Sequence, residues 1–455
     1  MDLSSQRRAL WSVPAVFLVG CAAAGRESYD AMRTDVDRAG IADSRQQAAD
    51  DGALSGPLLE RAAYVRAVLH RNRTIEVARQ GWRAAIARVR QMGALEDPMV
   101  ALEVAPLSIG SSSARFGYNA TISQHLPWPG KLALEESVAS AEADAEKSDY
   151  EAARRDLALA ASLLYDDYFV AARSLDINAQ HVDLMRSMRG GALAQFEAGR
   201  ASAQDPLQAE FELTHMEHDA VILVSKRDIA MAQMNELLHR APELPLPPPP
   251  KDLPLPAGPD VVDAQRLQSE AIDRRPEIAS ARHHARAEQA RADRAGREYL
   301  PDVTVSTSYN SMWDTPEHRW MVGLGFNLPV QTGRRGGAVD EANASRAKFE
   351  ADAARMSDAA RTQVAVAMKQ LEESAHVLHI YEERLLPIAR DEVRAARSAF
   401  TTSQVPFVAV IDAEKNLRTV ELEEQVGRAD YDRRHSELDR ALGRMPGLDG
   451  KDDGQ

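Results

Sequence analysis

The chain has 455 residues and a formal net charge of −14, from 69 acidic against 55 basic side chains. An acidic chain with interspersed signs and no basic patch is a poor nucleic-acid binder, which excludes DNA and RNA as partners. Aromatic residues make up only 5% of the chain. Ala, Glu, Arg, Leu and Gln dominate instead, and this bias is typical of long helices and coiled coils.

The amino terminus has the layout of a secretory signal. Two arginines precede an apolar run, residues 9–19, that is too short to span a bilayer. The single cysteine, Cys21, follows Leu-Val-Gly, and this resembles the lipobox of bacterial lipoproteins. We interpret residues 1–20 as a lipoprotein signal peptide and Cys21 as the lipidated first residue. A plain signal peptide with an incidental cysteine is the alternative.

A polar segment, residues 21–56, predicts an extended tether with weak helix ahead of a first repeat, residues 57–241. The repeat opens with a helix, and two short strands follow with apolar side chains at every second position. The second of these strands ends at a Pro-Trp-Pro-Gly corner, residues 127–130. A helix without proline then runs from Lys131 to about Ala198. At 1.5 Å per residue it is roughly 100 Å long, and its apolar residues follow heptad spacing.

The second half of the chain repeats the first. A proline-dense linker, residues 242–260, predicts a semi-rigid spacer of polyproline II geometry. The second repeat, residues 261–443, again reads helix, strand, strand, long helix, turn, helix, and a polar tail, residues 444–455, is expected to be disordered. Matched landmarks lie 202 to 204 residues apart, among them Pro98 with Pro301 and Gly130 with Gly333. Such a constant offset indicates duplication.

The four strands cannot form a closed barrel by themselves, because closed barrels start near eight strands. A two-faced sheet with open edges would aggregate, so other copies of the chain are expected to complete it. The apolar faces carry aromatic residues of the kind that face lipid in interface girdles, namely Phe116, Tyr118, Tyr309 and Trp320. A soluble sandwich with these residues in its core is the alternative.

Five motifs on this duplicated frame resemble the TolC-type outer-membrane efflux channels over nearly the whole mature chain. They are QHLPWPGK at 124–131, GRASAQDPLQAEFEL at 199–213, LPDVTVS at 300–306, GLGFNLPVQTGRR at 323–335 and VIDAEKNL at 410–417. The Pro-Trp-Pro-Gly-Lys form looks most like the heavy-metal-exporter branch of that family. Ala22 after the cysteine favours, by the same resemblance, sorting to the outer membrane.

The resemblance implies a mainly α fold with a membrane β-barrel. Three copies would join four strands each into a twelve-stranded barrel, and a long α-helical barrel would extend into the periplasm. The implied function is a passive exit duct for metal ions or drugs in a tripartite efflux system. An inner-membrane pump would deliver the substrate through a periplasmic adaptor, so neither enzyme activity nor a cofactor is expected.

The resemblance also assigns residues. Two tip turns would contact the adaptor, and they consist of Gly199, Arg200, Ala201, Ser202, Ser403, Gln404, Val405 and Pro406. Acidic residues just past the second tip constrict the pore in this family, and Asp412 falls at one such position. Ala409 occupies a second, and Ser403 replaces the usual glycine. A solvated aspartate on a helix is the alternative for Asp412.

Other classes of protein leave weaker signals. The chain has no Walker A sequence, nucleotide fingerprint, GxSxG or CxxC motif. His215 with His218, and His376 with His379, are spaced for one helix face, but neither pair has a third fixed ligand, and we expect no metal site. A periplasmic coiled-coil adaptor is the alternative function, and it predicts one central hairpin flanked by β domains.

Overall fold

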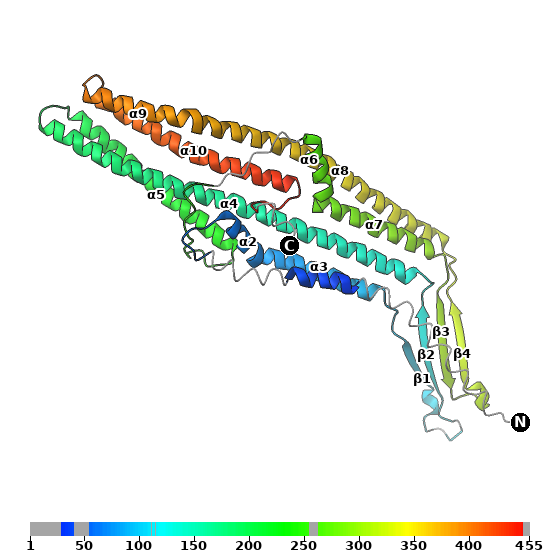
Figure 1. Cartoon of the computed structure of the whole chain (residues 1–455). Helices are drawn as coiled ribbons and strands as arrows, with labels where there is room; N and C mark the ends of the chain where they lie inside the picture. The colour runs from blue at the N-terminus through cyan, green and yellow to red at the C-terminus, as the bar shows by residue number, and fades with distance from the viewer. Residues whose placement is uncertain (1–28, 41–53, 111, 114, 254–262, 449–455) are drawn as a thin grey trace. The chain divides into compact units, whose positions relative to one another are not determined.

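The computed structural model describes residues 29–40, 54–110, 112–113, 115–253 and 263–448 (Figure 1). One order of elements occurs twice along the chain. The first half contains α2 (Arg61–Arg71), α3 (Arg73–Met92), β1 (Met99–Val104), β2 (Tyr118–Leu126), α4 (Lys131–Glu197) and α5 (Gln204–Leu237). The second contains α6 (Ala264–Arg274), α7 (Pro276–Arg297), β3 (Val303–Asn310), β4 (Trp320–Phe326), α8 (Thr332–Ile380), a π-helix (Tyr381–Leu385), α9 (Leu386–Thr401) and α10 (Phe407–Ala441).

These elements form two compact units, and each unit draws on both halves of the chain. Unit 1 contains Ala78–Tyr150, Glu277–Arg355 and the helical residues 29–39. Unit 2 contains Glu151–Pro276, Met356 onward and the described residues between Gly40 and Val77. The duplicated segments are therefore intertwined within each unit. In the described ranges, no helix combines the length and apolar composition that a bilayer crossing requires.

The sheet of unit 1 is a single antiparallel meander in the order β1-β2-β3-β4 (Figure 1). β2 and β3 join the two halves of the chain, with Leu126 opposite Val303 and Asn119 opposite Asn310. β1 and β4 are the edges. The single layer leaves both edge strands exposed on both faces, apart from partial cover at Gly323.

The register of the sheet separates an apolar face from a polar face. One face carries cross-strand rows such as the row formed by Leu102, Ala120, Tyr309 and Trp320. Rows such as Ala101, Thr121, Ser308 and Met321 share the other. The apolar face is open, since Val100, Leu102, Val322 and Leu324 are 70%, 68%, 81% and 64% exposed. The aromatic residues of this face are not enclosed either, since Phe116 and Trp320 are 51% and 67% exposed. In the described residues the aromatic side chains form no sandwich core, so that alternative is wrong for this chain.

The helices of unit 1 pack against one further helix near the amino terminus. The sequence predicted only weak helix there, within an extended tether. Residues 29–40 are helical, and Val36 is buried at 2% exposure. Asp37 pairs with Arg83 of α3, and Asp35 pairs with Lys147 of α4. The apolar contact and two ion pairs from distant residues order this segment.

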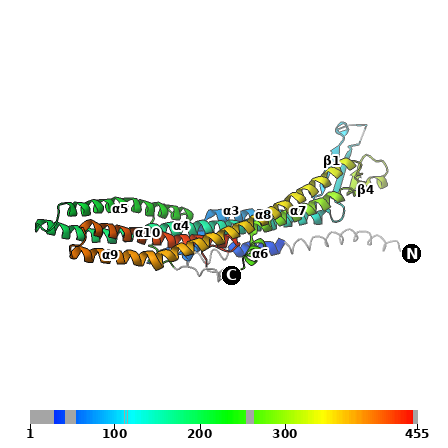
Figure 2. The ribbon, with the colours of Figure 1, turned by 90° about the horizontal axis from the view of Figure 1, so that it is seen from above.

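Unit 2 contains two helical hairpins, α4 with α5 and α9 with α10 (Figure 2). α4 and α10 lie between α5 and α9, and one apolar cluster joins α4, α5 and α10 near the hairpin turns. A second cluster joins α6, α8 and α10 through Leu267, Leu371 and Leu438. The unit is therefore held by contacts between the two halves of the sequence.

The opening helix of each half is broken where a single helix was expected. Asn72 separates α2 from α3, and Arg275 separates α6 from α7, which is the same place in the repeat. Both residues are extended. Pro276 explains the second break, because the residue before proline avoids the helical region. The Asn72 side chain explains the first, since its Oδ1 accepts from Thr74 N–H and caps α3.

Candidate functional site

The two tip turns of unit 2 have the same local geometry. Gly199 lies between α4 and α5 with φ of +69°, and Ser403 lies between α9 and α10 with φ of +58°. At the first tip, Arg200 N–H donates to the Gln195 carbonyl at 2.9 Å. At the second, Gln404 N–H donates to the Ala399 carbonyl at 2.8 Å. Both are Schellman-type helix ends, which need a left-handed residue and so favour glycine.

The other six residues assigned to the tips follow these two left-handed positions. Arg200, Ser202, Gln404 and Pro406 are exposed, and Ala201 and Val405 are partly buried. Pro406 directly precedes the first residue of α10, where a missing N–H costs no helix hydrogen bond. The tips therefore present short, polar, well-defined turns.

A small apolar core holds the tips in place. Met185 of α4, Leu213 of α5 and Ile411 of α10 belong to one buried cluster, and Phe407 and Phe400 pack at its end with ring centroids 5.4 Å apart. Such a cluster fixes the positions of the three helix ends, because buried apolar contacts are lost if one helix slides.

Asp412 lies immediately beyond this core. It is exposed and lines a pocket of about 500 Å³ between α5 and α10. Leu207 and Phe211 of α5 line the same pocket and are 68% and 67% exposed. In the described chain no ion pair involves Asp412. Among the described residues, its carboxylate therefore has no counter-ion on the protein.

Basic residues near Asp412 are paired with other carboxylates. Lys415 Nζ lies 2.8 Å from Glu212, and Arg418 Nη2 lies 2.6 Å from Asp219. Burial alone would raise the pKa of Asp219, but the hydrogen bond and charge of Arg418 hold that pKa below its usual value. These pairs engage Lys415 and Arg418, the two basic residues that follow Asp412 in the first turns of α10, with other carboxylates.

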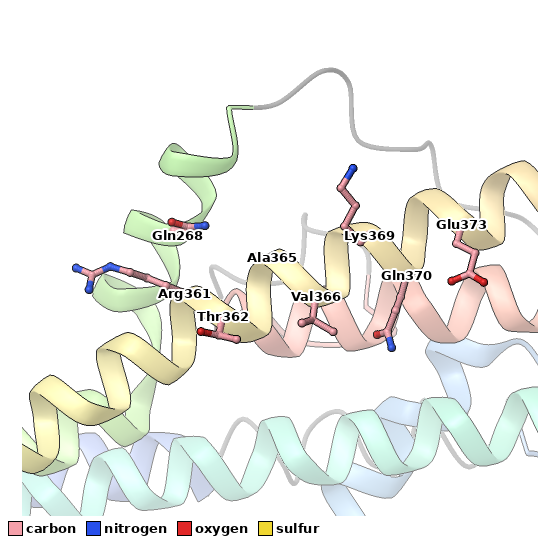
Figure 3. Close-up of a pocket in the computed structure, with 8 residues that line it drawn as sticks. All are labelled: Gln268, Arg361, Thr362, Ala365, Val366, Lys369, Gln370 and Glu373. Carbon is pink, nitrogen blue, oxygen red and sulfur yellow. The ribbon is translucent and has the colours of Figure 1, made fainter.

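A larger pocket, of about 530 Å³, lies between α6 and α8 (Figure 3). Figure 3 shows Gln268 on α6 facing α8, which carries Arg361, Val366 and Lys369. Arg361 pairs with Asp358 and Lys369 with Glu372, both within α8. The two basic residues of this pocket are thus compensated within one helix, whereas Glu373, which also lines it, forms no ion pair among the described residues.

The histidine pairs do not form a metal site in the part of the chain that the structure describes. His215 and His218 both approach Asp219, at 3.7 and 3.6 Å, but Arg418 occupies that carboxylate. His376 Nδ1 lies 2.8 Å from the backbone carbonyl of Glu372, one turn before it. No group of three or more His, Cys, Asp or Glu side chains converges within the described ranges.

The Pro-Trp-Pro-Gly-Lys corner of unit 1 contains a buried ion pair that the sequence did not reveal. Lys131 Nζ lies 2.9 Å from Asp302 Oδ1, and the lysine side chain is 4% exposed. The same carboxylate accepts from Trp128 N–H at 2.7 Å. Asp302 directly precedes β3, so this contact ties the two halves of the chain where the sheet meets the helices. Cys21 and the signal segment lie outside the described residues.

Comparisons with known proteins agree with this architecture. Residues 267–444 match the family model described as outer membrane efflux protein. No curated protein sequence matches the chain. Among solved structures, a membrane protein from Pseudomonas aeruginosa aligns with a TM-score of 0.71 and 19% identity, over 88% of this chain and 93% of that chain.

Two further structures show the same fold. A CusC structure aligns with a TM-score of 0.72 and 17% identity, over 86% of this chain and 94% of that chain. The MtrE outer membrane channel of Neisseria gonorrhoeae aligns with a TM-score of 0.62 and 16% identity, over 85% of this chain and 89% of that chain. The resemblance to the TolC-type outer-membrane efflux channels is therefore confirmed: residues 267–444 match the family's model, and the described chain has the fold of these channels.

Proposed function

We propose that the chain is the outer-membrane channel of a tripartite efflux system, in which it is a passive exit duct. A periplasmic adaptor would bind the tip turns and connect the duct to an inner-membrane pump. The pump supplies the energy, so the channel needs neither catalysis nor a cofactor. Metal ions or drugs are the proposed substrates, and selection among them would occur in the pump.

The two-faced open sheet is the observation that carries this proposal. Its apolar face is exposed on both edge strands and at Ile122 of β2 and is partly exposed along β3, whereas its polar face is rich in Ser, Thr, Gly and Asn. Three copies would supply the twelve strands of a closed barrel, with the apolar face toward lipid and the polar face toward water. β2 has nine residues, close to the 9–11 that a tilted membrane strand requires.

The aromatic residues support the same orientation. Phe116, Tyr118, Tyr309 and Trp320 form a continuous row, with successive ring centroids 5.3 to 5.8 Å apart. Such rows mark the interface between hydrocarbon and water in membrane barrels. Lipid attached to Cys21 would add a second anchor to the outer membrane. The two hairpins of unit 2 fit a channel better than an adaptor, for which one central hairpin was expected.

Disulfide cross-linking between chains tests whether neighbouring copies complete the open sheet. Within the chain, Val305 of β3 lies opposite Gln124 of β2. In the repeat, Leu102 of β1 corresponds to Val305 (offset 203) and Phe326 of β4 corresponds to Gln124 (offset 202). Leu102 of one chain should therefore lie opposite Phe326 of the next. We expect the double variant Leu102→Cys with Phe326→Cys to form disulfides between chains in native outer membranes. β1 and β4 are the opposite edges of the sheet, roughly 14 Å apart at 4.8 Å per strand, so the bond cannot form within one chain.

The expected result is a ladder of cross-linked chains that ends at three copies on a denaturing gel. The matched control is Glu103→Cys with Phe326→Cys, because Glu103 lies on the polar face and Phe326 on the apolar face. It should cross-link poorly. A chain that stays monomeric under oxidation, or a ladder that continues beyond three, would reject the trimeric duct.

A further inference from the structure

Two aspartates are completely buried where α2, α4 and α10 meet in unit 2. Asp166 of α4 and Asp432 of α10 both have 0% exposure. Asp432 acts on the Asp166 carboxyl group through its charge and through a side-chain hydrogen bond, and both effects raise the pKa of Asp166. Arg61 of α2 donates from Nη2 to Asp432 Oδ1 at 2.6 Å. The cluster therefore places two acidic groups beside one cation in the buried interior of the unit.

The charges of this cluster do not balance if both aspartates are ionised. Arg61 compensates one carboxylate, and a second buried carboxylate would be left without a counter-charge. Two carboxylates in contact also repel each other, and in such pairs one group keeps its proton. Burial first, and then the charge of Asp432, raise the pKa of Asp166 well above its usual value.

The neighbouring donors are engaged elsewhere. Tyr165 Oη donates to the Leu59 carbonyl at 2.7 Å, and Tyr64 Oη is directed to the Met234 carbonyl at 3.4 Å. Arg433 pairs with Asp167 and Asp430 on the exposed side. Within the described residues, neither oxygen of Asp166 meets a hydrogen-bond donor. No protein donor therefore stabilises an ionised Asp166, whereas a protonated Asp166 can donate its own hydrogen bond.

We propose that Asp166 and Asp432 share one proton at neutral pH, and that this proton fastens α10 to α4. Asp432 carries the negative charge because Arg61 pairs with it. Asp166 carries the proton and donates its O–H to the Asp432 carboxylate. The role does not depend on whether the chain is a channel, since it concerns only the packing of unit 2. α10 also carries Asp412, so the proton anchors the helix that bears the candidate constriction.

The proposal predicts how stability changes with pH. The unfolded aspartate has a pKa of about 3.9, and the folded pair holds its proton to higher pH. The folded state therefore becomes less stable as pH rises above about 4. The equilibrium constant for opening increases by up to tenfold per pH unit, until the pair loses its proton. Other charged or titratable groups that act on the cluster, from all three elements, are Glu60, Arg61, Tyr165, Tyr431 and Arg433.

Infrared spectroscopy of the full-length chain in detergent tests the proton directly. At pH 7 we expect a carbonyl stretch from a protonated carboxylic acid, and this band should be absent in Asp166→Asn. The matched control is Asp167→Asn, which changes the next residue of α4, a 60% exposed aspartate, and should keep the band. Asp432→Asn is a second check, because Asp166 would then ionise against Arg61 and the band should again disappear.

Hydrogen exchange of residues 425–441 tests the consequence. The ratio of protection in the unmodified chain to that in Asp166→Asn should fall between pH 5 and 8, by up to tenfold per pH unit. The ratio of protection in the unmodified chain to that in Asp167→Asn should stay constant with pH. A missing carboxylic acid band at pH 7, or a ratio to Asp166→Asn that does not change with pH, would overturn the shared proton.

Discussion

Lys131→Met should loosen the corner between sheet and helices in unit 1. Methionine keeps most of the volume and the apolar stem of lysine but removes the charge that Asp302 faces at 2.9 Å. The Asp302 carboxylate is only 12% exposed. It keeps the hydrogen bond from Trp128 N–H but loses its buried counter-ion. Unit 1 should therefore unfold more easily.

The size of the effect follows from the burial of the pair. Removing one partner of a buried ion pair costs about 3–5 kcal/mol. Because Asp302 keeps its contact to Trp128 and part of its contact with water, we expect the lower end of this range, about 3 kcal/mol. Lys369→Met is the matched control, since the Lys369–Glu372 pair is 81% and 54% exposed. Solvent screens such a surface pair, so Lys369→Met should melt close to the unmodified chain.

Thermal unfolding of the full-length chain in detergent, at fixed protein concentration, measures both variants. The double variant Lys131→Met with Asp302→Asn removes both charges and should recover part of the loss. Burial alone would raise the pKa of Asp302, but hydrogen bonds from Lys131 and Trp128 N–H lower it. A lowered carboxyl pKa stabilises the fold above about pH 3.9, and this stability is lost as pH falls further. If Lys131→Met melts like the unmodified chain, or the double variant recovers nothing, the pair does not hold the corner.

Three glycine positions and one serine position give further expected outcomes in thermal unfolding. Ser403→Gly should stabilise the second tip by about 1 kcal/mol, because Ser403 adopts a φ of +58° that glycine adopts freely. Gly199→Ala should destabilise the first tip by a similar amount, and equal melting temperatures for the two variants would contradict the argument. Gly443→Ala should cost at least about 2 kcal/mol, since φ is +76° and a Cβ would lie 2.9 Å from the Arg274 backbone. Gly191→Ala within α4 meets nothing within 4 Å and should stabilise by about 0.5–1 kcal/mol.

Local signals in the sequence were enough to place most elements. The helix expected from Lys131 to about Ala198 is α4, Lys131–Glu197. The corner before it contains Gly130 with φ of +88°, and the turn after it contains Gly199 with φ of +69°. Glycine at such positions has a direct backbone reason, so helix boundaries there can be predicted. The break at Arg275 had an equally local signal in Pro276, which the apolar spacing of the surrounding helix obscured.

Pairings between the two halves could not be predicted in the same way. Lys131 and Asp302 are separated by 171 residues, and nothing local to either residue indicates its partner. Asp166 looked like any charged position on a helix, yet it is completely buried because α4 packs against both α2 and α10. The helix at residues 29–40 depends on contacts with α3 and α4. In each case tertiary contacts, and not propensity, decide the outcome.

Asp412 gives the most direct test of the proposed constriction. Its carboxylate has no ion pair in the described chain, and three copies would bring three such charges around one axis. A pair of unit charges contributes about 1 kcal/mol at 4 Å in water and about a third of that at 12 Å. Three carboxylates acting on a divalent cation from about 12 Å therefore sum to about 2 kcal/mol, which is at least a tenfold change in affinity. Asp412→Asn should raise the divalent cation concentration for half-block of single channels in bilayers by that factor. Asp183→Asn, at a 79% exposed aspartate of α4, should leave the block unchanged, and an unchanged block in Asp412→Asn would remove this residue from the constriction.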